Sequence, residues 1–315
     1  MKLHTLVTQY VTYRKALGAQ FLRNEYILKA FVRAIGNNKN ISNVKAKQVN
    51  IFLAGEGPIT SNWHDKHLAL RGFYRYVISR DYTKGSPLPA IIPKKPQPLV
   101  PYIYNVKELR ALFDASLTYQ KNRTRIEPHT VRMILLLLYG AGLRVSEAIN
   151  LTLADVDLQQ ALLTIRETKF YKTRLVPLGT QLTQSLSEYD LRRQQEGYSQ
   201  NLQSAFFLGR NGKAIYYFNM DSAFKRIRKK AGIKRTDHIR FQPRLHDLRH
   251  TFAVHRLTAW YKEGADVQKM LPVLSVYLGH TQLSSTSVYL SMTPALLEEA
   301  GCRFQRYAFK EESHE

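Results

Sequence analysis

Proline dominates one segment of the chain and divides the rest in two. Residues 84–101, KGSPLPAIIPKKPQPLVP, hold six of the twelve prolines. Proline fixes its φ angle and has no backbone N–H, so this stretch favours an extended, semi-rigid linker over helix or sheet. A chain of 315 residues is long enough for two domains. We therefore expect a domain over residues 1–83, a linker at 84–101 and a second domain over 102–315.

The first 83 residues have the pattern of an all-helical domain. Apolar side chains that recur at helical spacing predict two helices, the first from Leu6, Tyr10, Tyr13 and Leu17, the second from Leu22, Tyr26, Ala30 and Phe31. Gly36 is positioned to end the second of these helices. Further helices are predicted near residues 43–54 and 61–80.

The second domain is predicted to be mostly helical with one β interruption. ALLTIRET (161–168) and TRLVPL (173–178) flank KFYK, which is typical of a β-hairpin with Lys169 at its turn. The longest apolar run, at 133–143, is well short of the about 20 residues that a membrane span needs, and it predicts a buried helix beside a charged site. Other helices are expected around 181–194, 218–231, 246–262, 265–271 and 295–309.

Basic residues outnumber acidic ones throughout the chain. Lys and Arg total 47 against 24 Asp and Glu, a formal net charge of +23. Residues 1–100 contain 16 basic and 4 acidic residues, a net +12, so the excess is spread over both domains. This distribution favours a surface that binds a polyanion, with double-stranded DNA or RNA as the leading candidate. A basic soluble protein without such a partner is the alternative.

Cysteine usage and the first residues indicate the compartment. The single cysteine, Cys302, allows no internal disulfide and no cysteine zinc site, which is typical of a reducing cytoplasm. The opening stretch MKLHTLVTQYVTYRK lacks the long apolar run of a secretory signal. We therefore expect a cytoplasmic protein, associated with the nucleoid if its partner is DNA.

The pentapeptide HDLRH at 246–250 admits two interpretations. Two histidines four residues apart beside an acid are similar to the HExxH helix of zinc proteases. Such a site needs a glutamate base and a third ligand, but Asp247 is a shorter acid. His255 lies nine residues after His246, on about the opposite side of the same helix. Arg249 would also place a fixed positive charge beside the metal, so zinc is disfavoured, while a purely structural role for the histidines stays open.

In the second interpretation, His246 and Arg249 bind a phosphate. Three residues apart on a helix, they share a face. A guanidinium offers a planar fork of donors that matches two phosphate oxygens. A phosphodiester under attack gathers charge on its equatorial oxygens, so two arginines and a histidine would stabilise the transition state more than the ground state. The pattern therefore predicts a second arginine nearby.

Four blocks of sequence carry a resemblance to a known family. They are, in order, GAGLRVSEAINLTLADVDL (140–158), ETKFYKTRLVPL (167–178), HDLRHTFAVH (246–255) and YLGHTQLSSTSVYL (277–290). Together they resemble the tyrosine recombinases of the phage integrase family. The resemblance implies a mainly α fold: an N-terminal helical core-binding domain of the SAM-like type, and a mixed α/β catalytic domain with a small β-hairpin, of the DNA breaking-rejoining enzyme fold. It also implies that the two domains close as a C-shaped clamp around duplex DNA.

The resemblance implies a phosphate site. Arg144, in GLRVSE, and Arg249 would bind the scissile phosphate. His246 would act as an acid or base or hold the phosphate, and His280, in LGH, would hydrogen-bond the same oxygens. Glu147, one turn after Arg144, is expected to brace that arginine. A role for Arg144 as a simple cap of the preceding apolar helix is the alternative.

The resemblance also implies an acid and a nucleophile. Lys169 would donate a proton to the departing 5′ hydroxyl, and Tyr289 would become joined to a DNA 3′ phosphate. Tyr277 is the nearest rival for the nucleophile, and Lys172 is the rival for the lysine. The family needs no metal and no cofactor, because the phosphotyrosine bond retains the energy for rejoining.

A basic cluster precedes HDLRH. Residues 221–240 contain eight basic and two acidic residues. Such a run is often only a solvated face, but in a chain already this basic it favours contact with DNA phosphates, which positions a duplex without reading its sequence. The residues expected to make these contacts are Lys225, Arg226, Arg228, Lys229 and Lys230.

The sequence thus predicts a site-specific recombinase or integrase that cuts and rejoins duplex DNA at inverted-repeat sites. The resemblance implies a homotetramer on two DNA sites, leaves room for accessory proteins and involves no membrane. A transposon- or mobile-element-linked role is favoured, because the helix predicted near Met1 leaves no place for an arm-site domain. The alternatives are a resolvase or invertase of the same chemistry, a nicking-closing enzyme similar to type IB topoisomerases, and a DNA-binding relative without catalysis.

The last predicted helix, 295–309, is amphipathic. One side carries Leu297, Ala300, Phe304 and Tyr307. Because a C-terminal helix commonly docks on the neighbouring protomer in the family, we expect the same here, so that one subunit governs the tyrosine of another. Packing against its own domain is the alternative.

Overall fold

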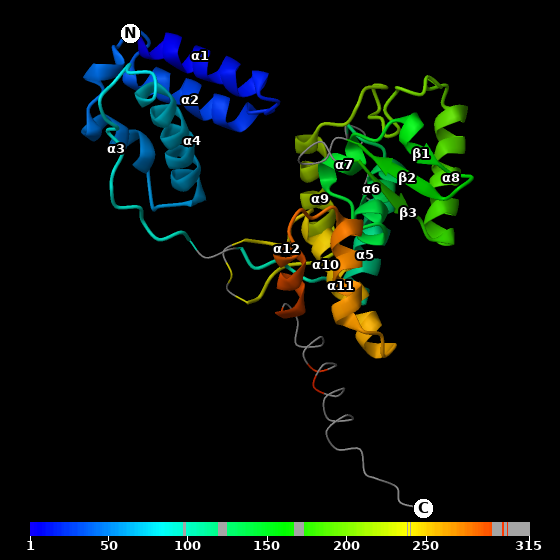
Figure 1. Ribbon diagram of the computed structural model, residues 1–315. Coiled ribbons are helices and arrows are strands. Elements are labelled where there is room, and N and C mark those ends of the chain that lie inside the picture. The colour runs from blue at the N-terminus through cyan, green and yellow to red at the C-terminus, as the bar shows by residue number, and fades with distance from the viewer. Residues whose placement is uncertain are drawn as a thin grey trace, which may run out of the picture. The chain divides into compact units, whose positions relative to one another are not determined.

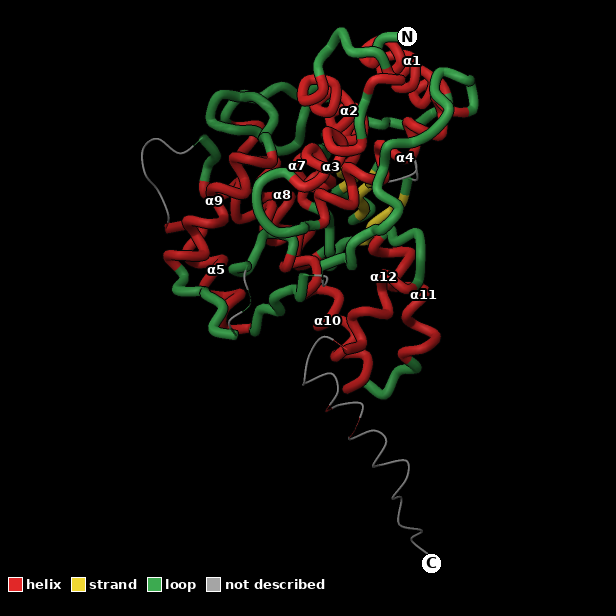
Figure 2. The backbone as a smooth tube through the Cα atoms, turned by 90° about the vertical axis from the view of Figure 1, so that its left-hand side faces the viewer, coloured by secondary structure: helices red, strands yellow, loops and turns green. Residues whose placement is uncertain are grey.

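The computed structural model describes residues 1–96, 99–118, 125–166, 173–237, 239, 241–291, 298 and 301. The chain divides into two compact units, residues 1–99 and 100–315, and the division falls inside the proline-rich segment. Helices make up most of both units in the described ranges, and short strands occur in the second (Figures 1 and 2). The mainly α fold expected from the sequence, with its small sheet, is confirmed.

Four α-helices build the N-terminal unit. Helix α2 contacts the three others, and α4 also packs against α1 and α3. A short 3-10 turn, η1 (Ile41–Asn43), precedes α3. The helices are α1 (Leu3–Ala16), α2 (Leu22–Ile35), α3 (Ala46–Ala54) and α4 (Ser61–Ile78), which confirms the predicted all-helical composition. Gly36 ends α2 with a φ of 109°, a conformation that glycine tolerates.

The buried face of α2 differs from the one that the predicted spacing suggests. Leu22 and Tyr26 are 70% and 69% exposed, whereas Phe31 is completely buried. Leu22 lies nine residues before Phe31, which at 3.6 residues per turn is the opposite side of the helix. The stripe that packs into the core consists of Ile27, Leu28, Phe31, Val32 and Ile35.

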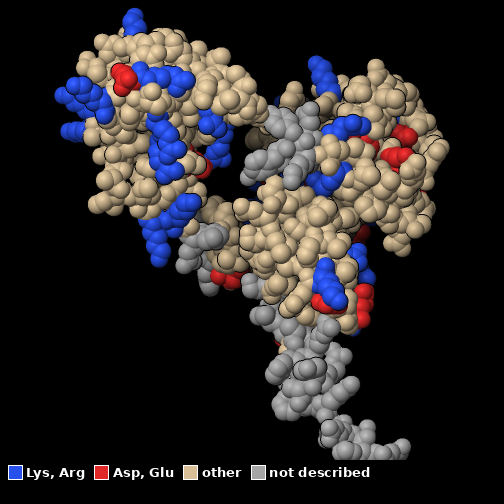
Figure 3. Space-filling view, viewed as in Figure 1, with Lys and Arg blue, Asp and Glu red and all other residues tan. Residues whose placement is uncertain are grey.

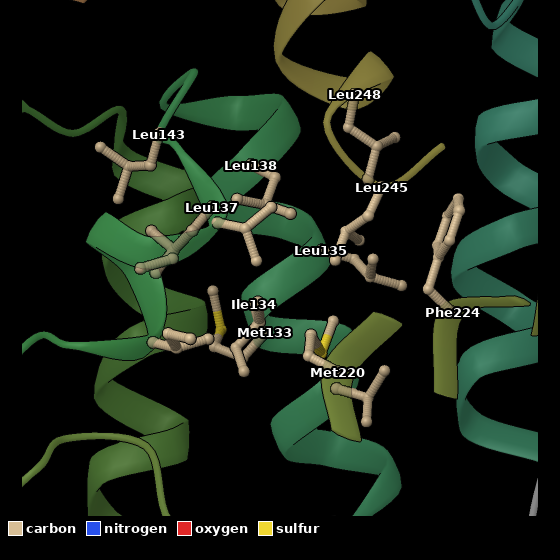
Figure 4. Close-up of a cluster of buried hydrophobic side chains, with 14 of the residues drawn as sticks. Met133, Ile134, Leu135, Leu137, Leu138, Leu143, Met220, Phe224, Leu245 and Leu248 are labelled. Atoms are coloured by element: carbon tan, nitrogen blue, oxygen red, sulfur yellow. The ribbon is translucent and has the colours of Figure 1, made fainter. Parts of the chain in front are cut away.

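One helix, α6 (Pro128–Gly140), lies at the centre of the second unit. It starts with a proline in the first turn, where the missing N–H costs no hydrogen bond. Leu135, Leu137 and Leu138 of α6 are almost fully buried, as the predicted buried helix requires. Figure 4 shows these leucines in one cluster with Phe224 and Leu248. The helices that pack against α6 are α5 (Val106–Thr118), α7 (Val145–Ile149), α8 (Thr180–Gln195), α9 (Tyr217–Lys230) and α10 (Asp247–Lys262).

The sheet is antiparallel, with strand order β1-β2-β3. Its strands are β1 (Val156–Asp157), which follows the 3-10 turn η2 (Leu153–Asp155), β2 (Leu162–Ile165) and β3 (Arg174–Pro177). In the β2–β3 pair, Leu163 lies opposite Val176 and Ile165 opposite Arg174, which confirms the predicted hairpin strands. The predicted turn with Lys169 falls in 167–172, outside the described residues.

Beyond α10 the chain forms α11 (Val267–Leu278), α12 (Ser284–Ser287) and a 3-10 turn, η3 (Val288–Ser291). The predicted helix at 265–271 is too short, because α11 continues through Pro272 to Leu278. Proline there removes one backbone hydrogen bond, while the helix gains burial of Leu274 and Leu278. The prediction for 295–309 lies outside the described residues, apart from 298 and 301.

The surface reflects the composition. Lys and Arg side chains stand out over Asp and Glu on the face of the N-terminal unit drawn in Figure 3. Within the ranges that the structure describes, none of the helices has the length and apolar character to cross a membrane.

We predict that residues 1–99 fold alone. Their buried side chains form a core of their own around Phe31, Leu70 and Phe73, separate from the core of the second unit. The isolated fragment should show a cooperative loss of helical circular dichroism on heating. Within it, Leu70→Ala should lower the free energy of unfolding by about 2–5 kcal/mol, because Leu70 is completely buried. Leu68→Ala, at a position 59% exposed, is the matched control and should change it little. A fragment without a cooperative transition would contradict the domain division.

Candidate active site

The carboxylate of Glu147 holds two arginines from different elements. It lies in α7, and the backbone N–H and the Nη1 of Arg144 donate to its two oxygens at 2.8 and 2.5 Å. Arg174, at the start of β3, donates Nη1 and Nη2 to the same two oxygens at 3.0 and 2.8 Å. The expected bracing of Arg144 by Glu147 is therefore confirmed, and the bidentate pair with Arg174 adds the sheet to the same site.

Arg249 reaches this cluster from α10 and is 1% exposed. Its Nη1 donates to the carbonyl of Gly142 at 2.6 Å and its Nη2 to the carbonyl of Leu278 at 2.5 Å. Nη1 also lies 3.7 Å from a carboxylate oxygen of Glu147. One buried guanidinium thus connects the end of α6, α10 and the end of α11.

Two glycines make room for this arrangement. Gly142 has a φ of 61°, and a Cβ there would lie 2.5 Å from the ring of Phe252. Gly279 ends α11 with a φ of 67°, and a Cβ there would lie 2.8 Å from Nη1 of Arg174. The carbonyl of Gly279 accepts from Nη2 of Arg144 at 2.8 Å. Glycine at both positions lets the backbone approach the guanidinium groups closely.

Charge in the cluster is strongly unbalanced. Burial alone would raise the pKa of Glu147, but hydrogen bonds and charge from Arg174, then Arg144, lower it to about 2. Burial lowers the pKa of Arg249 to about 10, and the neighbouring Arg144 acts in the same direction. At neutral pH three guanidinium groups therefore face one carboxylate, a local charge of +2, which suits an anionic ligand.

Tyr289, in η3, lies against these arginines and is 3% exposed. Burial raises the pKa of its hydroxyl, while the charges of Arg249 and Arg144 and a hydrogen bond with Arg249 oppose the rise. The hydroxyl also lies 3.0 Å from Nδ1 of His250. A neutral phenol thus stands beside the positively charged cluster.

Three histidines lie near Tyr289: His250 and His280 contact its ring, and His246 contacts His250. Burial lowers the pKa of His246, His250 and His280 to about 4, and nearby arginines add to the effect, so all three are neutral at pH 7. The ring of His280 stacks on Tyr289, with centroids 6.2 Å apart, and its Nδ1 bonds the hydroxyl of buried Thr286 at 2.7 Å. The ring of His246 meets His250 edge-on, with centroids 4.9 Å apart.

Tyr277, the rival for the nucleophile, faces elsewhere. Its hydroxyl donates to the carbonyl of Pro177 at 3.4 Å, and its ring stacks on Phe252. Its own carbonyl accepts from Nε of Arg174 at 2.9 Å. This tyrosine therefore supports β3 and the arginine cluster.

Asp247 and His255, the other residues considered for a zinc site, have partners other than Tyr289. Asp247 is completely buried and accepts from the backbone N–H and Nη2 of Arg244 at 2.8 and 2.9 Å. His255 places Nδ1 at 3.1 Å from the hydroxyl of Tyr139. Neither side chain joins the histidines around Tyr289.

The structure brings together five of the six predicted catalytic residues: Arg144, His246, Arg249, His280 and Tyr289. The sixth, Lys169, and its rival Lys172 lie outside the described residues. The sequence patterns did not point to Arg174 or Thr286, and for His250 they suggested only a metal ligand or a structural residue. The i, i+4 spacing of His246 and His250 was the one signal that could have placed His250 beside the phosphate site.

The predicted DNA contacts lie along α9. Lys225, Arg226, Lys229 and Lys230 are exposed, and Lys225 also pairs with Asp221 at 2.6 Å. Lys230 donates to the carbonyl of Thr118 at 3.0 Å. Arg228 is turned inward and donates to the carbonyl of Pro243, so it is less available to DNA than its neighbours.

Clustered arginines, neutral histidines and a buried tyrosine on a mainly helical two-unit chain define a class: enzymes that attack a phosphodiester with tyrosine. The profile of the phage integrase family matches residues 105–295. The chain belongs to this family and is a tyrosine recombinase, a class of enzymes that cut and rejoin DNA.

Individual relatives and solved structures agree. The integrase/recombinase-type protein y4rB of Sinorhizobium fredii is 35% identical over 249 residues, 78% of this chain and 79% of that protein. The tyrosine recombinase XerC of Oceanobacillus iheyensis is 32% identical over 292 residues, 89% of this chain and 87% of that protein. The fold is similar to the Tn1549 transposon integrase in complex with transposon right end DNA, with a TM-score of 0.68, 17% identity, and coverage of 98% of this chain and 100% of that one.

We predict that Glu147→Gln destabilises the second unit in a pH-dependent way. The folded pKa of about 2 lies below the ordinary value of 4.5, so the ionised carboxylate stabilises the fold above about pH 4.5 and loses this effect as the pH falls toward 2. The difference in free energy of unfolding should be on the order of 3 kcal/mol at pH 7. Urea titrations at several pH values measure it.

Glu188→Gln is the matched control. Glu188 is exposed and bonds only Gln184 among the contacts described for it. This variant should unfold like the parent at each pH. A Glu147→Gln protein as stable as the parent at pH 7 would contradict the assigned role of the carboxylate.

Proposed function

We propose that this tyrosine recombinase is a site-specific recombinase or integrase that works through a covalent 3′-phosphotyrosine intermediate. The observation that carries the proposal is the placement of the Tyr289 hydroxyl, which lies 3.0 Å from Nδ1 of His250 and close enough to Arg249 and Arg144 for their charges to lower its pKa. A local charge of +2 would bind the scissile phosphate, and the phenol would be the nucleophile.

In the proposed cleavage step, the oxygen of Tyr289 attacks phosphorus and forms a P–O bond. The bond from phosphorus to the 5′ oxygen breaks, and Lys169 supplies the proton that the departing oxygen needs. Arg144 and Arg249 donate to the non-bridging oxygens, where charge accumulates in the transition state. His280 and His246, neutral at pH 7, would donate or accept hydrogen bonds at the same phosphate. Rejoining reverses these steps.

The remaining parts of the proposal concern the DNA and the assembly. The exposed basic side chains of α9 and of the N-terminal unit support binding to double-stranded DNA. We propose that the enzyme acts as a homotetramer on two inverted-repeat sites, and that residues 295–309 dock on the neighbouring protomer. Similarity in fold to a transposon integrase supports a mobile-element role. An enzyme of this kind would act in the cytoplasm, on the nucleoid.

We predict that Tyr289→Phe binds a duplex site normally and forms no covalent DNA–protein adduct, since only the hydroxyl is lost. The measurement is gel electrophoresis after incubation with a suicide substrate in excess EDTA, because the proposed chemistry uses no metal. Tyr277→Phe is the matched control and should still form adducts, since its hydroxyl bonds Pro177. Adducts in Tyr289→Phe, or their loss in Tyr277→Phe alone, would overturn the assignment. Cleavage that EDTA blocks would argue for a metal.

A second prediction separates the two lysines of the segment KFYK (169–172). Lys169→Ala should slow adduct formation by about 10²–10⁴-fold, the usual effect of losing a general acid. A substrate with sulfur in place of the bridging 5′ oxygen should restore much of the rate, because a thiolate leaves without protonation. Lys172→Ala should cleave both substrates at rates near those of the parent. The reverse result would assign the acid to Lys172.

A further inference from the structure

His250 contacts the hydroxyl of Tyr289, the proposed nucleophile, through a ring nitrogen. Its Nδ1 lies 3.0 Å from the hydroxyl of Tyr289. The positive charges of Arg249 and Arg144 lie close enough to this hydroxyl to lower its pKa and so to favour loss of its proton. A neutral imidazole with its proton on Nε2 would accept that proton at Nδ1.

The protonation state of His250 agrees with this direction. Burial lowers its pKa to about 4, and charges nearby act in the same direction, so the ring is neutral at pH 7. In the tautomer with the proton on Nε2, the Nδ1 lone pair is free to accept. The groups that face the ring are Arg244 and Arg249 from its own segment, His246 at its edge, and His280 and Tyr289 from the segment after α11. A DNA phosphate in the site would add negative charge and raise the basicity of the ring.

The other two histidines are placed for different contacts. Nδ1 of His280 bonds Thr286, and the ring presents its face to Tyr289. His246 meets the ring of His250 and lies one turn before it on the chain. Among the hydrogen bonds of the described residues, the Tyr289 hydroxyl is bonded by His250 and by neither of these two.

We infer that His250 is a catalytic residue, the general base that takes the proton of the Tyr289 hydroxyl as the phenol oxygen attacks phosphorus. This inference rests on the proposed function of Tyr289. The O–H bond breaks, its electrons form the new O–P bond, and the proton passes to Nδ1. The P–O5′ bond breaks at the same time, and the 5′ oxygen takes its proton from the general acid. In rejoining, the protonated His250 returns the proton to the departing phenolate.

The test uses His250→Asn in the full chain. The amide can still accept a hydrogen bond near the place of Nδ1, but it cannot take up a proton. Single-turnover adduct formation on a suicide substrate should slow by about 10²–10⁴-fold at neutral pH. Its rate should rise with pH as hydroxide replaces the base, whereas the parent rate should stay flat from about pH 6 to 9. A variant within a few-fold of the parent, with the same pH profile, would overturn the inference and leave His250 a positioning role.

A second variant gives an independent measurement. His250→Ala leaves a space for added imidazole, which should restore adduct formation in proportion to the concentration of its neutral form. Rescue by imidazole depends on proton transfer and would not follow from a structural role. A rate that imidazoles of different pKa leave unchanged would overturn the inference.

Two controls separate this inference from the proposed function. His255 lies on the same helix as His250, but its ring bonds the hydroxyl of Tyr139. The variant His255→Asn should therefore cleave DNA like the parent. If neither the parent nor His255→Asn forms an adduct at Tyr289, the proposed function itself fails. The substrate with a 5′ sulfur should not restore His250→Asn, because its defect lies at the attacking oxygen. If the 5′-sulfur substrate restored the rate of His250→Asn, His250 would act on the leaving group, and its assignment as the base would be overturned.

Discussion

The contact on which the site depends is the carboxylate of Glu147 among three guanidinium groups. Arg144 directly precedes α7, while Arg174 and Arg249 lie in β3 and α10, and the side chains of these last two are 9% and 1% exposed. Buried cations repel one another and lose their hydration, so such a group is stable only with a compensating acid and well-aligned acceptors. Glu147 supplies the acid, and the carbonyls of Gly142, Leu278 and Gly279 supply acceptors. The remaining excess of positive charge is what a phosphate can neutralise.

The same contacts also position Tyr289, the proposed nucleophile. Arg249 bonds Leu278 at the end of α11, and the chain then turns at Gly279 and reaches Tyr289 after α12. Thr286, completely buried in α12, holds His280 through its hydroxyl. The arginine cluster and Tyr289 are therefore parts of one packed unit, and we expect a change in the arginines to shift the phenol as well.

Much of this arrangement could be predicted from the sequence, because several residues lie in motifs with strong local order. His246 and Arg249 share a helix face, so their spacing predicted a phosphate site, whereas Arg144, His280 and Tyr289 were expected from the resemblance to the family. Arg174 could not be found this way, since it stands in a short strand and meets Glu147 only through the fold, 27 residues away. His250 is visible in the motif, but its partner lies 39 residues on. The exposed Leu22 shows the same limit, because helical spacing does not say which side packs.

The electrostatics of the site explain how it can hold reactive groups and yet stay stable without DNA. The arginines are permanently charged, and their charge adds to burial in lowering the pKa of His246, His250 and His280, which keeps these rings neutral. For the phenol of Tyr289 burial alone favours the neutral form, because the charges of Arg249 and Arg144 lower its pKa. A bound phosphate would reverse part of this balance, because its negative charge favours protonated histidine. A histidine of the site would then accept a proton most easily when the phosphate is bound. The charge of the substrate would thus couple proton transfer to DNA binding.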